Sequence, residues 1–415
     1  MKTHIKTEKN KQLRGNIRLN NMPTSVHLSD AAFRIEGQPM FKVLDRVQKL
    51  EQNGETIIHF ELGDPDFSTP AHIINAACDS MNRGETHYTS SMGLYDMRVA
   101  SAKTTKLSRG FLPSIDQVLV TPGANLIIYL AIHCLVNKAE EVILPDPGFP
   151  TYYSVAKLCE VQPVRVPLKE KNHFRMNPDD VNEAITPKTR LIIINSPNNP
   201  TGAVMTKDEI NEIYKIAADN DIYLLSDEVY SRMMYGNTKF YSPSMNDACQ
   251  HTTIITNGFS KAFAMTGWRL GVAIGPKAVI EKMGLLVQTL CSCVPPFVQR
   301  AGIAAIQGDQ KPVNDMMATY KKRRDILVNG LNRIDGIHCL KSEGAFYVFP
   351  NITATGMTSE EFADFALDHA KVALLPGNNF GKYGEGYVRL TYATSVDNIE
   401  EGLRRLQNAL SERSS

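Results

Sequence analysis

The sequence predicts an α/β protein in which a large domain with a mostly parallel sheet is joined to a smaller α+β domain. Three observations predict this architecture. From about residue 76 to 310, short apolar runs alternate with helical patterns, which is typical of a doubly wound sheet. The runs are almost continuously apolar, so we expect strands that are covered on both faces. After about residue 312 the alternation gives way to a long helical stretch and a few scattered strands.

The N-terminal part is predicted to contain an arm, a helix and a strand. Residues 1–28 lack periodicity and are interpreted as a flexible arm. The stretch 38–54 has apolar residues at helical spacing and ends at a glycine. TIIHFELG (56–63) is predicted to be a strand, and DPDFSTP is a turn that follows it.

Six short apolar runs are predicted to form the sheet of the large domain. Their ranges are 117–121, 141–145, 190–195, 222–227, 252–256 and 269–275. Helices are predicted between them near 124–136, 206–219 and 276–290. We therefore assign residues 76–311 to the large domain.

The small domain is predicted from the changed pattern near the C-terminus. A helix over 312–333 leads to the strands FYVFP, VALLP and YVRLTYA, with helices between them. We assign residues 312–415 to this domain and expect residues 29–75 to join it.

Composition and charge exclude several classes of protein. Among 415 residues, 43% are hydrophobic and 21% are charged, and the formal net charge of +1 predicts no attraction to nucleic acid or to an anionic membrane. The N-terminus has no apolar core of the kind found in a secretory signal, and no run of about 18 apolar residues occurs. The seven cysteines are scattered apart from Cys291 and Cys293, so we expect reduced thiols, a cytoplasmic protein and no metal site.

Functional residues are expected directly after the predicted strands, because sheets of this type bind ligands at the carboxyl ends of their strands. Gly123 permits a tight turn after the first strand, and Ala124 and Asn125 then open a helix whose free amides favour an anion. This signal is weak alone, since any strand–Gly–helix junction resembles it. Phe149 follows the second strand in a Pro/Gly turn and suits either core packing or the stacking of a bound ring.

The later strands are followed by more specific residues. INSPNNPTG (194–202) places Asn199 before a proline whose peptide bond can be cis, which would turn the Asn199 amide over the sheet edge. Asp227 ends a strand and Tyr230 follows it; such a carboxylate is either a helix cap or the partner of a protonated ring nitrogen. GFSKAFAMTGWRLG (258–271) adds two cations, Lys261 and Arg269, beside a predicted strand.

Together these residues indicate a ligand that has a phosphate, an aromatic ring with a basic nitrogen, and a group that reacts with lysine. That ligand is pyridoxal 5'-phosphate. Over about residues 30–410 the chain resembles the class I/II aminotransferases of fold type I, the aspartate aminotransferase-like family. Six motifs carry the resemblance in order and spacing: LGDPDFSTP, HYTSSMGLYDMR, SPNNPTG, SDEVY, SKAFAMTGWRLG and YVRLTYA.

The resemblance implies a role for each matching residue. Lys261 matches the Schiff-base lysine, which must be neutral to attack an aldehyde and later acts as the base. Arg269 matches the phosphate-binding arginine, Asp227 the partner of the pyridine nitrogen, and Asn199 and Tyr230 the groups that hydrogen-bond the phenolic oxygen of the ring. Phe149 takes the stacking position.

The resemblance also implies a substrate site and a second chain. Arg389 matches the arginine that binds the substrate α-carboxylate, and Gly63 matches a backbone position beside it. Tyr88 matches a tyrosine that reaches the phosphate of the neighbouring subunit, so a homodimer is implied. Closure of the small domain over the substrate is expected.

Two departures from the family pattern affect these assignments. Relatives commonly carry Ser where this chain has Gly258, so phosphate binding is expected to be weaker or to use Ser260 or a backbone amide. Many bacterial aspartate-type relatives have GGK where this chain has GAN, and Asn125 cannot supply a cation to a dicarboxylate side chain. A neutral or aromatic amino donor is therefore favoured.

The expected reaction is transfer of the amino group of an L-amino acid to a 2-oxo acid, with 2-oxoglutarate as the expected acceptor. The alternative on the same scaffold is a β-lyase or an eliminating enzyme similar to aminocyclopropane-carboxylate synthase, because Lys261, Asp227 and Arg389 set Cα deprotonation and not the later steps. Two further classes are disfavoured. A transcription regulator needs a DNA-binding module, for which residues 1–28 are too few. A Rossmann dehydrogenase needs a G-x-G-x-x-G after an early strand, and the sequence has none there.

Overall fold

The apolar runs form one seven-stranded sheet in the computed structural model, which describes residues 28–35, 37 and 40–414. Its strands are β2 (Val118–Thr121), β3 (Glu141–Asp146), β4 (Gln162–Pro167), β5 (Thr189–Asn195), β6 (Tyr223–Asp227), β7 (Thr253–Gly258) and β8 (Gly271–Ile274). The spatial order is β2-β8-β7-β6-β5-β3-β4. Only β8 runs antiparallel to its neighbours, so the other strands end at one edge of the sheet. The predicted mostly parallel α/β sheet is confirmed.

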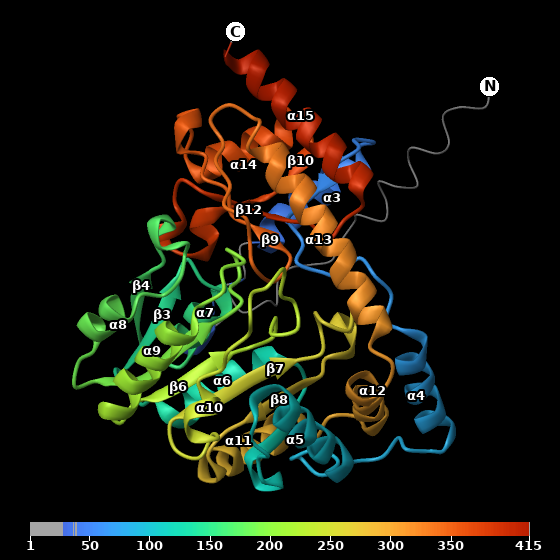
Figure 1. The fold of residues 1–415 in the computed structure, drawn as a ribbon, viewed down its shortest axis with the longest axis vertical. Coiled ribbons are helices and arrows are strands. Elements are labelled where there is room, and N and C mark those ends of the chain that lie inside the picture. Colours follow the sequence, from blue (N-terminus) through green and yellow to red (C-terminus); the bar gives the residue numbers. More distant parts are fainter. Residues whose placement is uncertain (1–27, 36, 38–39, 415) are drawn as a thin grey trace, which may run out of the picture. The chain divides into compact units, whose positions relative to one another are not determined.

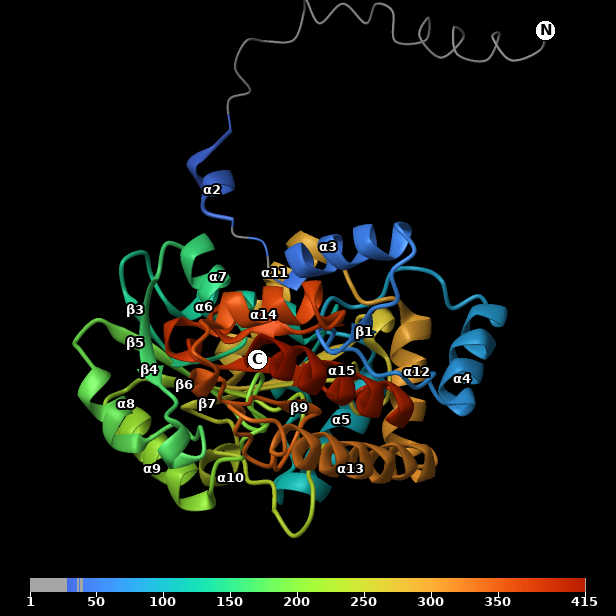
Figure 2. The ribbon, with the colours of Figure 1, turned by 90° about the horizontal axis from the view of Figure 1, so that it is seen from above.

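Helices cover both faces of this sheet. They are α4 (Ala71–Asn82), α5 (Tyr95–Arg109), α6 (Ala124–Leu135), α7 (Pro150–Leu158), α8 (Pro178–Ala184), α9 (Lys207–Asp219), α10 (Ser244–Asp247), α11 (Lys277–Cys291) and α12 (Pro296–Gln307). Figure 2 shows α8 and α9 on the side of the sheet opposite α6, α7 and α11. Successive residues of one strand serve different faces: Ile254 packs with the core under α6 and α11, whereas Ile255 packs with the core under α5 and α12. Both positions are buried, which is why the strand sequences are continuously apolar.

A second group of elements combines α3 and β1, from the N-terminal part of the chain, with the elements that follow residue 310. Its strands are β1 (Ile58–His59), β9 (Tyr347–Val348), β10 (Val372–Ala373), β11 (Leu375–Pro376) and β12 (Val388–Thr391), and its helices are α3 (Met40–Gln52), α13 (Lys311–Leu331), α14 (Ser359–Asp368) and α15 (Val396–Ser414). Strand β1 pairs with β10, and β12 lies between β11 and β9. Figure 1 shows α13, α14 and α15 around β9, β10 and β12, where buried side chains such as Phe60, Tyr320 and Leu406 form a core.

Two strands differ from the prediction, for separate reasons. β4 was not predicted, because QPVRVP contains two prolines; the structure places it at the sheet edge, where proline is tolerated. The strand predicted over 56–63 pairs only at Ile58–His59 in β1. Beyond it, the carbonyls of Glu61 and Gly63 accept hydrogen bonds from side chains at the site described below.

The predicted arm, residues 1–28, lies outside the described residues apart from Leu28. Residues 28–35 belong to a separate unit of the chain and contain the short helix α2 (Asp30–Phe33), which Ser29 caps by accepting a hydrogen bond from the Ala32 amide. Throughout the part of the chain that the structure describes, no helix combines the length and apolar character needed to cross a bilayer. All seven cysteines are described, and all are free thiols.

Candidate active site

The residues that follow the parallel strands meet at one cavity of about 220 Å³ at the carboxyl edge of the sheet. Each predicted site residue except Gly123 and Tyr88 lines it: Gly63, Ala124, Asn125, Phe149, Asn199, Asp227, Tyr230, Ser260, Lys261, Arg269 and Arg389. They are separated by up to 326 positions in the sequence, and the common edge of the sheet brings them together. The Asn199–Pro200 peptide bond is cis, as predicted.

One end of the cavity is built to receive an anion. Helix α6 begins at Ala124, so the amides of its first turn have no acceptor within the helix. A Cβ on Gly123 would overlap the Arg269 guanidinium, which therefore lies directly against this helix start. A Cβ on Gly271 would come within 2.7 Å of the Ala124 nitrogen, so glycine is required there as well. Arg269 makes no ion pair with a carboxylate among the residues described, and its charge is available to a ligand.

Lys261 lies in the connection between β7 and β8, and its amine reaches the cavity. Its Nζ donates a hydrogen bond to the Gly63 carbonyl. Burial lowers the pKa of Lys261 to about 8; the positive charges of Arg389 and Arg269 act in the same direction, while Asp64 opposes them. Near pH 7, the Lys261 amine is therefore neutral more often than the amine of an exposed lysine. The neutral form is the one that attacks a carbonyl carbon.

Asp227 ends β6 with its carboxylate in the cavity wall. Tyr152 donates a hydrogen bond to its Oδ2 at 2.6 Å, and the Val229 amide donates to its Oδ1 at 3.3 Å. Burial raises the pKa of Asp227 to about 6, and these two hydrogen bonds limit the rise. A buried carboxylate with this pKa is suited to share a proton with a basic ring nitrogen.

Arg389 is almost fully buried and holds the far side of the cavity. Its Nη1 donates to Asn199 Oδ1 at 3.1 Å, and its Nη2 donates to the Glu61 carbonyl at 2.6 Å. Its guanidinium lies 4.5 Å from the ring centre of Tyr347 and 4.8 Å from that of Phe380. Its buried Nε has no hydrogen-bond partner among the described residues. A cation fixed in this way can receive a carboxylate.

Several residues that line the cavity were not predicted from the sequence, among them Tyr152 and Tyr347. Tyr152 follows Phe149 by three positions, which places both on one face of the start of α7, and this spacing could have indicated it. Tyr347 hydrogen-bonds Tyr230 through their hydroxyls at 2.9 Å, and its hydroxyl occupies the space where a Gly63 side chain would lie. No local pattern marks Tyr347, because its partners lie far away in the sequence.

Tyr88 does not line the cavity of its own chain. Its side chain is 88% exposed, and the neighbouring Thr89 amide donates a hydrogen bond to Cys293 Sγ at 3.4 Å. Gly258, at the position where relatives commonly have Ser, lies in the cavity wall together with Ser260.

Comparison with known families settles what kind of protein carries this site. The model of the family "Aminotransferase class I and II" matches residues 55–406. The chain belongs to this family. Like its other members, this aminotransferase moves an amino group between an amino acid and a 2-oxo acid and uses pyridoxal 5'-phosphate.

Several aminotransferases resemble the whole chain. An aspartate aminotransferase of Pyrococcus horikoshii is 41% identical over 92% of this chain and 97% of its own. The aromatic-amino-acid aminotransferase 2 of Thermococcus litoralis is 39% identical over 93% of this chain and 99% of its own. A solved structure of an aspartate aminotransferase from Rhizobium meliloti superposes with a TM-score of 0.90 at 31% identity, covering 93% of this chain and 99% of that one. The predicted fold type I architecture is thereby confirmed.

The residues present fit pyridoxal 5'-phosphate. Arg269, which has no carboxylate partner among the described residues, and the start of α6 suit a phosphate dianion, and the carboxylate of Asp227 suits a pyridine nitrogen. The Lys261 amine, with its lowered pKa, suits an aldehyde.

Proposed function

We propose that Lys261 binds the cofactor aldehyde and carries the proton that leaves and rejoins the substrate Cα. The observation that supports this role most directly is the Lys261 amine in one cavity with Asp227 and Arg389. When bound, the cofactor supplies an electron sink for the electrons left at Cα. A neutral amine can accept the Cα proton, and burial with two nearby arginines favours that neutral form.

The other side chains are proposed to hold the cofactor. Asp227 keeps a negative charge beside the ring nitrogen, and Tyr152 fixes the orientation of that carboxylate. Phe149 presents a ring face, while Asn199 and Tyr230 orient the ring oxygen. The phosphate is bound by Arg269, by Ser260 and by the amides at the start of α6, so that Gly258 needs no hydroxyl.

Substrate binding is assigned to Arg389 and Gly63. Arg389 receives the α-carboxylate. Of the small domain expected over 29–75 and 312–415, the part within the second unit of the chain, residues 37–75 and 312–415, is proposed to close over residues 76–311 and complete the site. Of the residues described, those lining the cavity contribute only Lys261, Arg269 and Arg389 as cations, and each already has an assigned task. We therefore infer an amino donor with a neutral or aromatic side chain. We keep 2-oxoglutarate as the acceptor; because the same cavity wall leaves its second carboxylate without a cation, we expect it to bind mainly through Arg389 and with a high KM.

A panel of amino donors tests this proposal. With 2-oxoglutarate as acceptor, kcat/KM for aromatic and neutral aliphatic donors should exceed that for aspartate by about 10-fold or more, because a site without a matching cation leaves the side-chain carboxylate unpaired. Initial rates of glutamate formation measure this ratio. Asn125→Lys is the matched variant, since it adds a cation to the cavity wall, and it should raise the relative kcat/KM for aspartate. A wild-type preference for aspartate would contradict the inferred donor, and release of ammonia without an acceptor would indicate a lyase.

We further propose a cytoplasmic homodimer in which Tyr88 of each chain completes the site of the other. Tyr88 and Leu290 are both exposed, and the Thr89–Cys293 hydrogen bond brings their segments together. Exposed large apolar side chains on adjoining segments support an interface between copies of the chain.

Hybrid dimers test the contribution of Tyr88. Tyr88→Phe should weaken cofactor binding by about 10-fold or more, because it removes a hydrogen bond to a charged phosphate. Mixed dimers of a Lys261→Ala chain and a Tyr88→Phe chain contain one complete site, so they should regain wild-type cofactor affinity at that site. Sedimentation establishes the dimer, and titration with the cofactor measures the affinity. A monomer, or hybrids no better than Tyr88→Phe dimers, would rule out the shared site.

A further inference from the structure

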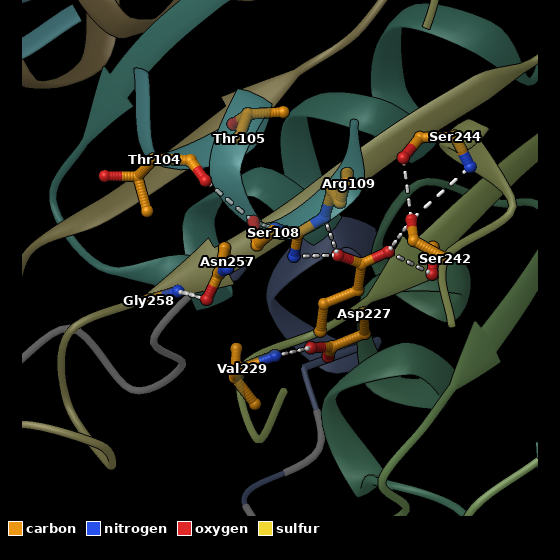
Figure 3. Close-up of polar contacts among 12 residues, drawn as sticks. Thr104, Thr105, Ser108, Arg109, Asp227, Val229, Ser242, Ser244, Asn257 and Gly258 are labelled. Carbon is orange, nitrogen blue, oxygen red and sulfur yellow. Dashed lines mark hydrogen bonds and ion pairs between the residues drawn. The ribbon is translucent and has the colours of Figure 1, made fainter. Parts of the chain in front are cut away.

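A buried ion pair lies directly behind Asp227. Glu228, the next residue, is fully buried, and its Oε2 accepts hydrogen bonds from Nε of Arg109, at 2.8 Å, and from Nη2 of the same side chain. Its Oε1 accepts from Ser226 Oγ at 3.0 Å and from Ser242 Oγ at 2.5 Å. Figure 3 shows Arg109 from α5, with Ser242 and Ser244, close to the turn that carries Asp227 and Val229.

Both oxygens of the Glu228 carboxylate accept hydrogen bonds, and both side chains of the pair are buried. Arg109 is 8% exposed, and its remaining Nη1 donates to Ser108 Oγ at 2.7 Å. Replacing a fully buried ion pair by apolar residues often leaves stability unchanged or improves it, so packing alone does not explain the presence of this pair. A charge close to a carboxylate shifts the pKa of that carboxylate, so the pair acts on Asp227 as well as on packing.

The backbone connects the pair to the cavity. Asp227 and Glu228 are consecutive residues whose side chains leave the strand on opposite sides, with Asp227 in the cavity wall and Glu228 facing α5. The Glu228 amide donates to the Thr256 carbonyl at 2.8 Å, and the Ser231 amide donates to the Glu228 carbonyl at 2.9 Å. The end of β6 is thereby fixed from behind.

Arg109 is the cation that contacts the Glu228 carboxylate, so the other ionisable groups nearby decide whether its charge is the one that balances Glu228. Burial raises the pKa values of Tyr152, Tyr230 and Cys249 well above their ordinary ranges, so these groups stay neutral near pH 7. The ionisable groups near the pair are Asp227, Arg232 and Asp247, whereas Lys261 and Arg269 lie on the cavity side of Asp227. Burial is the main cause of the raised pKa of Asp227, and the Glu228 charge adds to the rise. Without Arg109 against it, the Glu228 charge would act on Asp227 more strongly.

We propose that Arg109 and Glu228 are positioning residues that keep a single net negative charge, that of Asp227, behind the ring nitrogen of the bound cofactor. The proposal rests on the role of Asp227 given under the proposed function. In this arrangement the guanidinium offsets the Glu228 charge, while the backbone hydrogen bonds of Glu228 fix the end of β6 that carries Asp227. Neither residue touches the cofactor or the substrate.

The visible spectrum of the bound cofactor tests this charge balance. Its absorbance changes with pH as the bound cofactor loses a proton, and the midpoint of that change is sensitive to nearby charge. Glu228→Gln keeps an acceptor for Arg109 but leaves its permanent positive charge unbalanced, so the midpoint should fall by ~0.5–1 pH unit. Arg109→Gln combined with Glu228→Gln removes both charges and should return the midpoint close to the wild-type value. Arg109→Lys retains the pair and should also leave it unchanged.

Controls separate this effect from a loss of structure. Glu401 is paired with Arg404 and Arg405 on the surface of α15, so Glu401→Gln removes a paired carboxylate far from the cavity and should give no shift. Circular dichroism and titration of the cofactor-free proteins report folding and cofactor affinity. If Glu228→Gln does not fold, the double variant and Arg109→Lys must still share the wild-type midpoint. Equal midpoints in Glu228→Gln and wild type, or a double variant displaced as far as Glu228→Gln, would overturn the proposal. A wild-type protein that shows no cofactor band would instead refute the proposed cofactor site on which this inference rests.

Discussion

Lys261→Ala is expected to lower kcat for transamination by on the order of 10⁴-fold or more, because it removes both the amine that binds the aldehyde and the base that moves the Cα proton. The residues assigned to the phosphate and the ring are untouched, so the variant should fold and keep measurable cofactor affinity. Stopped-flow and steady-state rates with the best donor of the panel measure the loss.

A covalent label provides the second readout for Lys261. Borohydride treatment of the wild-type protein should attach the cofactor irreversibly to the peptide that contains Lys261, and the same treatment of Lys261→Ala should label no peptide. Lys261→Arg is the matched control, since it preserves a positive charge without a usable amine, and it should be as inactive as the alanine variant. Substantial turnover in either variant would show that another group serves as the base.

The positions of most site residues could be predicted because they follow apolar runs. In an open sheet of parallel strands, residues after those runs must share one edge, so Asp227 at the end of β6 and Asn199 after β5 meet although no local pattern connects them. Arg389 was different: its place on β12 beside Asn199 depends on how two sheets meet, and only the family resemblance indicated it.

Contacts between distant segments could not be read from the sequence. Arg109 looks like an ordinary basic residue in the last turn of α5, where a cation suits the helix dipole, and nothing nearby shows that its partner is Glu228. Likewise, the sequence shows Tyr347 only as an aromatic residue in an apolar strand, and the structure alone shows that its hydroxyl hydrogen-bonds Tyr230. Side-chain pairs formed by folding leave no periodic signal.

The second large effect is expected from Arg389. Its guanidinium is held between the rings of Tyr347 and Phe380 and by acceptors on Asn199 and Glu61, so its position is set before substrate arrives. Arg389→Gln is of similar length but carries no charge. It should lower kcat/KM for amino acids by roughly 10²–10³-fold, mainly through KM, because the α-carboxylate loses its charged partner. The kcat/KM of Arg389→Lys should lie between those of the wild type and Arg389→Gln, since an ammonium keeps the charge but cannot reproduce the planar pair of donors.

Arg389→Gln should also change the pH dependence of cofactor uptake, because Arg389 acts on the pKa of Lys261. Arg389 is one of the positive charges that lower the pKa of Lys261 to about 8, so Arg389→Gln should raise that pKa. The rate at which cofactor-free protein takes up pyridoxal 5'-phosphate should increase with pH as Lys261 loses its proton, and the midpoint of the increase should lie at higher pH in Arg389→Gln than in the wild type. Arg389→Lys keeps the charge and should leave the midpoint in place, although its KM rises. A variant with a raised KM and an unmoved midpoint would show that Arg389 binds substrate without acting on Lys261, whereas an unchanged KM would remove Arg389 from the substrate site.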